Sequence, residues 1–288
     1  MSEPQNGTRR ARFAVPGWMR RHTPLLSRVL GQFAEVRVLD CATRLAAQAF
    51  LGALPAVFVI GALAPDWLQD QLVSSLRRTL GLQDAALDQV RDVYAGTDPT
   101  ALAGTGAVGV VVTLVSATAC SRALQTTCER SWHLPKAGAR LTAWRWAAWL
   151  GMWLAALVFQ GALQTAFGTS RVVGFVLAAV SGVLLWWWTQ HLLLGGRVPW
   201  LPLLPGAVLA GFGAELLVLG SKVYMPGAVE RSMQEFGPLG SVFVLLSWLI
   251  ALFFVIAAAI AVGQVLAHEP WAVRRLHTGA AAGPGGAP

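Results

Sequence analysis

The sequence predicts an all-α protein, an integral membrane bundle of six transmembrane helices with a bent first helix and an outer amphipathic helical region between spans one and two. Of its 288 residues, 55% are hydrophobic and 12% are charged, whereas soluble domains carry about 25% charged residues. The mean hydropathy is +0.56. The run 241–267 has no ionisable side chain before His268. At about 1.5 Å per helical residue, it is long enough to cross a hydrocarbon core of about 30 Å.

Residues 1–39 form a basic region in which we predict an amphipathic helix. Apolar side chains between residues 25 and 36 recur at the spacing of one helix face. This pattern fits a basic helix lying on the inner membrane surface, and an ordinary helix packed on the bundle fits it equally. The arginines of the region are Arg9, Arg10, Arg12, Arg20, Arg21, Arg28 and Arg37.

The first predicted span covers about 41–63, with Arg44 and Gln48 in its inner half and Pro55 in its interior. Because proline removes a backbone hydrogen bond, we expect this helix to be bent or broken. The following region, 65–99, is rich in aspartate, and its leucines recur every four residues. We expect two short amphipathic helices there, outside the membrane and capping the bundle.

The second and third predicted spans cover about 101–123 and 143–166. The second opens with a run of glycines, 104–109, that matches a dinucleotide-binding fingerprint letter for letter. Because no strand precedes it, we interpret these glycines as sites of close helix packing in lipid. In the third span, Gln160 and Gln164 lie four residues apart, so both are expected to face protein or a polar cavity rather than lipid.

The fourth predicted span covers 172–194, and the fifth runs from Pro205-Gly206-Ala207 to about residue 223. Glu215 lies ten residues beyond Pro205, which places its carboxylate near the middle of the membrane. A charge there costs roughly 2.5 to 3.5 kcal/mol on insertion scales. We therefore expect Glu215 to have a partner, a proton or an internal aqueous cavity.

The sixth predicted span is the run 241–267, with Gln264 near its end. It is entered through the stretch 236–240, in which Gly237 and Gly240 allow close approach to neighbouring helices. We expect residues 40–268 to form one transmembrane domain that includes the outer region, and residues 269–288, rich in Gly, Ala and Pro, to form a disordered tail.

The basic residues indicate the orientation of the chain. Lys and Arg concentrate in the N-terminal region, the second-to-third and fourth-to-fifth connections and the C-terminal region, while 65–99 is acidic. Because cytoplasmic loops carry an excess of Lys and Arg, we predict that both termini are cytoplasmic. The odd number of cysteines, Cys41, Cys120 and Cys128, favours free thiols in a reducing compartment.

Several motifs occur in an order and at a spacing that resemble a known family. They are Leu54-Pro55, the basic connection from Arg122 to Arg145, Val198-Pro199-Trp200 with Pro205-Gly206-Ala207, Tyr224, and Phe236-Gly237 with Gly240 and Trp248. On these residues the chain resembles the YihY/BrkB family of bacterial inner-membrane proteins, long mislabelled as ribonuclease BN. It departs from that family at Phe236, where tyrosine is common, and at Gly263-Gln264, where an acidic residue is frequent.

The resemblance implies a protein of the bacterial inner membrane that supports envelope integrity, with transport of lipid-linked or osmoprotective compounds as a proposed activity. The residues themselves suggest a polar cavity for a lipid-linked or small polar substrate, bounded by the first, fifth and sixth spans. The candidate lining residues are Arg44, Gln48, Gln160, Gln164, Glu215 and Gln264, and the helix-break and packing residues are Pro55, Pro205, Gly206, Gly237 and Gly240.

The alternative function is a structural or scaffold membrane protein that binds envelope partners through its outer region. We expect no enzyme, cofactor or metal centre, because nuclease chemistry needs clustered carboxylates or histidines. The region facing the cytoplasm is instead basic and nearly free of carboxylates. Membrane lipids are the expected partners of this positive charge, rather than nucleic acid, and the sequence leaves a homo-oligomer open.

Overall fold

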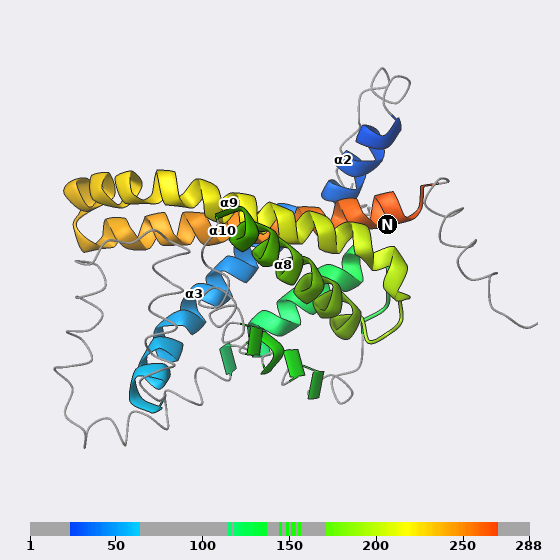
Figure 1. Cartoon of the computed structure of the whole chain (residues 1–288), viewed down its shortest axis with the longest axis horizontal. Coiled ribbons are helices and arrows are strands. Elements are labelled where there is room, and N and C mark those ends of the chain that lie inside the picture. Colours follow the sequence, from blue (N-terminus) through cyan, green and yellow to red (C-terminus); the bar gives the residue numbers. More distant parts are fainter. Residues whose placement is uncertain are drawn as a thin grey trace, which may run out of the picture.

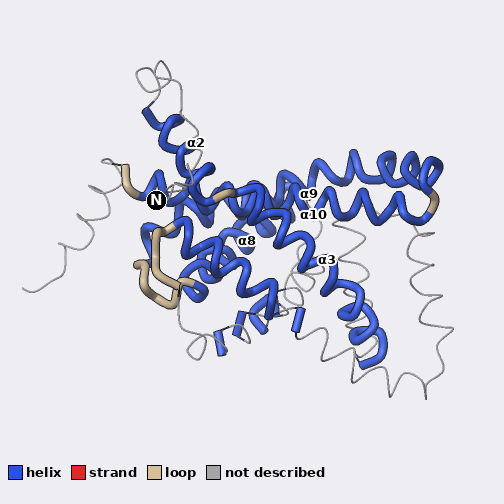
Figure 2. Tube along the Cα trace, turned by 180° about the vertical axis from the view of Figure 1, so that it is seen from behind, coloured by secondary structure: helices blue, strands red, loops and turns tan. Residues whose placement is uncertain are grey.

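The computed structural model describes residues 24–63, 115–116, 118–136, 144–145, 148–149, 151–153, 155–156 and 171–269, and the regular structure in these ranges is helical throughout (Figures 1 and 2). The long helices are α2 (Pro24–Val36), α3 (Val38–Leu63), α8 (Arg171–Leu193), α9 (Trp200–Phe236) and α10 (Pro238–Ala267). Residues 118–131 are also helical and are called the helix 118–131 below. The all-helical part of the predicted fold is therefore confirmed.

A hairpin of α9 and α10 forms the longest part of the molecule, and the two helices lie side by side along their length (Figure 1). They contain 37 and 30 residues, which corresponds to about 55 and 45 Å at 1.5 Å per residue. Gly237 joins them with φ of 62°, in the left-handed region that glycine adopts at little cost. Gly240 then lies directly against the backbone of Ser232 on α9, so a side chain at position 240 has no room.

The structure differs from the prediction in the extent of α9. The fifth span was expected to begin at Pro205 and to end near residue 223, whereas α9 begins at Trp200 and continues through Pro205 and Pro226 to Phe236. Each proline costs one backbone hydrogen bond. In lipid, an irregular segment would leave many more backbone groups without partners, so a continuous helix is the less costly arrangement.

The N-terminal amphipathic helix is present as α2, and its C-terminal end packs on the bundle. Val36 and Val38 are buried against Ala257 and Ala261 of α10. Arg37 separates α2 from α3 with a positive φ of 57°, which ends one helix before the next begins. α3 then runs without interruption through position 55, so a break there is not seen and the predicted bend stays a prediction.

The main core forms where α8, α9, α10 and the helix 118–131 meet. Its buried side chains include Leu124, Trp186, Leu203 and Ile260. α9 and α10 approach closely at Gly206 and Gly263, where a Cβ atom on Gly263 would overlap the backbone of Gly206. Small residues at helix crossings allow this contact in membrane proteins, where packing drives helix association.

Three helices of the described chain are long and apolar enough to cross a membrane. They span Val173–Leu193, Trp200–Phe236 and Leu239–Ala267, which supports a multi-pass membrane protein. The outer region 65–99 and most of the second and third predicted spans lie outside the described residues. The count of six spans therefore stays a prediction.

Candidate functional site

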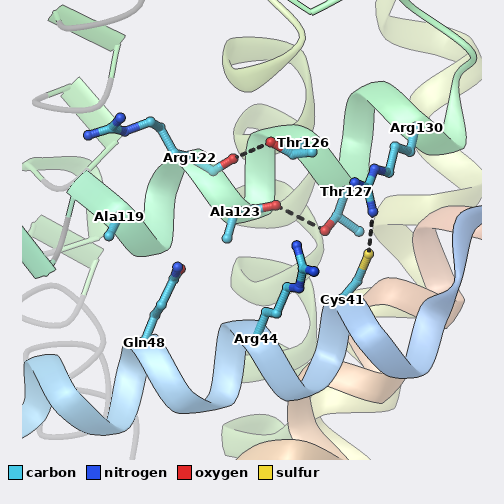
Figure 3. A pocket seen from close by; sticks show the side chains of 9 residues that line it. All are labelled: Cys41, Arg44, Gln48, Ala119, Arg122, Ala123, Thr126, Thr127 and Arg130. Atoms are coloured by element: carbon cyan, nitrogen blue, oxygen red, sulfur yellow. Dashed lines mark hydrogen bonds between the residues drawn. The ribbon is translucent and has the colours of Figure 1, made fainter.

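A pocket of about 370 Å³ lies between α3 and the helix 118–131 (Figure 3). α3 contributes Cys41, Arg44 and Gln48 to its lining. The helix 118–131 contributes Ala119, Arg122, Ala123, Thr126, Thr127 and Arg130. The pocket thus has two walls, each formed by one face of one helix.

Helical periodicity explains why these side chains lie together. On α3 the lining residues are separated by three and four positions, and on the facing helix each lining residue lies three or four positions from another one. Residues spaced in this way share one face of an α-helix. Figure 3 shows Arg44 and Gln48 extending from α3 toward the opposite wall, while Arg130 reaches from that wall toward Cys41.

The lining carries positive charge, and none of the described lining residues is a carboxylate. Arg130 Nη1 lies 3.9 Å from the Cys41 sulfur, a weak contact for a guanidinium. Arg44 has no ion pair within the described part of the chain. The hydroxyls of Thr126 and Thr127 donate to the carbonyls of Arg122 and Ala123 at 2.8 and 3.0 Å, so their lone pairs remain available. The pocket therefore presents charged hydrogen-bond donors from both walls.

The carboxylates near this pocket form ion pairs with arginines that do not line it. Asp40, one turn before Arg44, pairs with Arg37 at 2.6 Å. Glu129, adjacent to Arg130 in sequence, is buried and pairs with Arg197 at 2.6 Å. Because consecutive residues of a helix point about 100° apart, Glu129 and Arg130 serve different neighbours. Each of these two carboxylates therefore has an arginine partner that does not line the pocket.

The wall formed by the helix 118–131 is held in position at its C-terminal end. Arg197, in the turn between α8 and α9, binds Glu129 and also donates to the carbonyl oxygens of Pro135 at 2.6 Å and Leu194 at 2.8 Å. From α2, Gln32 Nε2 donates to the carbonyl of Ser131 at 2.9 Å. Contacts from distant parts of the chain thus converge on this one end of the helix.

One ion pair and one contact between a glutamate and a histidine also hold α2 at the same end of the bundle. Arg28 binds Glu269, just after α10, at 2.6 Å, and Glu35 lies 3.1 Å from His133 Nε2. Together with the Gln32 bond, they connect α2 to both the end of α10 and the segment after the helix 118–131. The position of α2 is therefore set by polar contacts as well as by the apolar contact of Val36.

Gln48 is the last of the three lining residues along α3. Its Oε1 atom is buried and has no hydrogen-bond partner among the described residues. A buried polar atom without a partner costs about 1–3 kcal/mol, so this amide is a site where water or a ligand group gains a hydrogen bond.

The structure brings together only part of the predicted polar cavity. Arg44 and Gln48 line the pocket, as just described. Glu215 on α9 and Gln264 on α10 are half-buried and do not belong to its lining. Gln160 and Gln164 lie outside the described residues.

Sequence reasoning missed the opposite wall of the pocket, above all Arg122 and Arg130. It ended the second span near residue 123 and treated the next residues as a basic connection, whereas the helix continues to residue 131. The signal was present in the spacing, because Arg122, Thr126 and Arg130 lie four residues apart. In a continuous helix they share one face.

A comparison with protein-family models gives a match to the model described as "Virulence factor BrkB" over residues 29–282. The matched range begins within α2 and extends beyond the end of α10, so it includes both walls of the pocket. Neither the comparison with curated proteins nor that with solved structures gives a match. On the family match and its long apolar helices, the chain belongs to the BrkB family and is a helical, multi-pass membrane protein.

Proposed function

We propose that this protein transports or flips a lipid-linked or small polar compound in the bacterial inner membrane and thereby supports envelope integrity. The observation that carries the proposal is the pocket between α3 and the helix 118–131, with Arg44, Arg122 and Arg130 in its lining. Charged side chains in a membrane bundle are costly and mark substrate or ion pathways. A polar pocket in a largely apolar bundle is what a polar substrate requires for its first binding step.

The basic character of this end supports a cytoplasmic location for the pocket. Arg28, Arg37, Arg130 and Arg197 lie on the segments that meet there, around the end of α10. Because Lys and Arg are enriched on the cytoplasmic side of membrane proteins, we place the pocket at the cytoplasmic leaflet, with anionic membrane lipids as neighbours.

The lining also supports a binding role rather than an enzymatic one. General acid–base or metal-assisted hydrolysis needs carboxylates or imidazoles near the substrate. None of the lining residues in the described part of the chain carries either group. We therefore propose a protein that is not an enzyme, has no cofactor and does not act on nucleic acid.

A scaffold is the second candidate, and the far part of the α9–α10 hairpin favours it. Val223, Tyr224, Phe236 and Leu239 are strongly exposed there, and apolar side chains of this size need lipid or a protein partner to cover them. A scaffold would use this surface or the outer region 65–99 and would have no use for the arginine-lined pocket. The two functions therefore differ in their dependence on Arg44.

Complementation of an envelope-defective bacterial strain separates the two candidates. We expect the wild-type chain to restore growth on detergent-containing medium, and Arg44→Gln and Arg130→Gln to fail although they accumulate in the membrane. Lys136→Gln is the matched control, because Lys136 is an exposed base outside the pocket lining. If both arginine variants complement as well as this control, the transport proposal is wrong and the scaffold is favoured.

A further inference from the structure

We infer that the pocket between α3 and the helix 118–131 binds a phosphate group, as a monoester or diester. This inference rests on the proposed function and names its substrate class, a compound that carries phosphate. Arg44 and Arg130 are its principal ligands, one from each wall.

The two principal arginines approach the pocket from opposite sides. Arg44 extends from α3 toward Ala123 and Thr127, and Arg130 extends from the opposite helix toward Cys41 (Figure 3). A guanidinium presents a planar fork of N–H donors that matches two oxygens of a phosphate. A tetrahedral group between these walls can therefore be bound from two directions, which a single surface arginine cannot do.

Charge decides against a cationic ligand. None of the described lining residues is a carboxylate, and the neighbouring carboxylates of Asp40 and Glu129 each bind an arginine outside the lining, Arg37 and Arg197, at 2.6 Å. Guanidinium groups that share one pocket repel one another, and an anion between them replaces this repulsion with attraction. Glu129 is buried and is not part of the lining.

The volume of the pocket and its remaining polar group indicate that the ligand is a phosphate ester rather than inorganic phosphate. A volume of about 370 Å³ lies near the lower end of the range of about 300–1,000 Å³ found for ligand pockets, so there is space for an ester substituent. Gln48 also brings an amide whose buried oxygen has no hydrogen-bond donor among the described residues. A hydroxyl on the substituent, as in a glycerol or sugar phosphate, would supply that donor.

The same phosphate chemistry is available from two sources, a phospholipid headgroup and a water-soluble phosphate compound. The test uses the full chain purified in an uncharged detergent, with binding followed by tryptophan fluorescence. One arm titrates phosphatidic acid in mixed micelles, and the other titrates glycerol 3-phosphate in the aqueous phase. Phosphatidylcholine, whose phosphate is masked by a choline cation, serves as the reference lipid.

We expect the wild-type chain to bind at least one of the two phosphate probes more tightly than phosphatidylcholine. Arg44→Gln and Arg130→Gln should weaken that binding about tenfold or more, because a hydrogen bond to a charged group contributes about 1.5–3 kcal/mol. Arg44→Lys should recover part of the affinity, since it restores the charge without the planar fork. Lys136→Gln should change it less than about twofold.

Preference for phosphatidic acid assigns the site to a lipid headgroup, and preference for glycerol 3-phosphate assigns it to a soluble compound. Equal affinity of wild type, Arg44→Gln and Arg130→Gln for both probes would overturn the inference. Thermal unfolding of each variant without ligand shows whether a loss of binding reflects misfolding, and in that event the Arg44→Lys titration decides the result.

The binding assay and the complementation assay can fail separately. A pocket variant that loses phosphate binding but still complements would leave the phosphate site in place and contradict the transport function. If the wild-type chain binds neither probe but the arginine variants fail to complement, the phosphate site is contradicted. Transport of another polar compound then stays in place.

Discussion

Arg197 and Glu129 form a largely buried ion pair, with 2.6 Å between Arg197 Nη2 and Glu129 Oε1 and with the two side chains 28% and 5% exposed. The pair joins the turn between α8 and α9 to the helix 118–131, which forms one wall of the arginine-lined pocket. It therefore links the stability of the bundle to the geometry of the site.

Removing the arginine of this pair should destabilise the protein strongly. Arg197→Met leaves the Glu129 carboxylate buried without its cation, which costs about 3–5 kcal/mol in comparable pairs. Thermal and denaturant unfolding in detergent measure this loss. The matched control is Arg37→Met, whose pair with Asp40 has both side chains exposed, at 70% and 44%, so about 1 kcal/mol or less is expected. Equal losses for both variants would mean that burial of Glu129 does not govern the effect.

Close packing of α9 against α10 should make Gly263 sensitive to a single added methyl group. A Cβ atom there would overlap the backbone of Gly206, and backbone cannot move aside as a side chain can. Gly263→Ala should therefore lower stability by about 1–3 kcal/mol. Gly220→Ala, on the same hairpin, meets nothing within 4 Å and should be neutral or stabilising by up to about 1 kcal/mol. A tolerated Gly263→Ala would show that the hairpin can separate without cost.

Cys128 should resist thiol reagents for as long as the protein is folded. The residue is fully buried and lies beyond the second predicted span. Burial, assisted by the adjacent Glu129 carboxylate, raises the pKa of its thiol from 9.0 to about 12. The stability associated with the protonated thiol is fully present below about pH 9 and is lost as the pH rises through about 12.

A variant with Cys41→Ser and Cys120→Ser leaves Cys128 as the only thiol of the chain. Its raised pKa keeps the thiol protonated at pH 8, and the thiolate is the reactive form, so maleimide should label it only after denaturation, as measured by intact mass. Rapid labelling of the folded protein at pH 8 would show that the helix 118–131 opens readily at this position.

Substitution of Glu215 should show whether the polar pathway extends beyond the pocket. It lies on α9, half-buried, seven residues before Lys222. Because a carboxylate within a spanning helix is costly and marks function, we expect Glu215→Gln and Glu215→Ala to reduce complementation of the envelope-defective strain. The exposed neighbour Leu216 provides the control, since Leu216→Ala should complement fully. Full complementation by both Glu215 variants would remove this carboxylate from the pathway.

Local features of the chain were predictable because they depend on neighbouring residues. The amphipathic pattern before residue 37 corresponds to α2, the fourth predicted span at 172–194 corresponds to α8 at Arg171–Leu193, and the apolar run 241–267 lies within α10. The resemblance to the BrkB family is confirmed by the family match. Hydropathy and helical periodicity are properties of one segment of the chain, so that segment alone is enough to predict its helix.

Other features were decided only by the tertiary structure. The continuation of α9 through Pro226 depends on its packing along α10, since proline alone favours a helix end. The position of Arg130 opposite Arg44 depends on how the helix 118–131 lies across α3, and no spacing within either segment specifies that contact.

The sequence by itself thus determined a bundle of apolar helices with basic connections, because transfer from water to lipid is a property of each segment. Only the tertiary structure decided which of the basic residues became structural and which lined a pocket. Arg197 is held by a buried carboxylate, whereas Arg44 faces the pocket. The physical reason is that the role of a charge depends on the groups that packing places within a few ångströms of it.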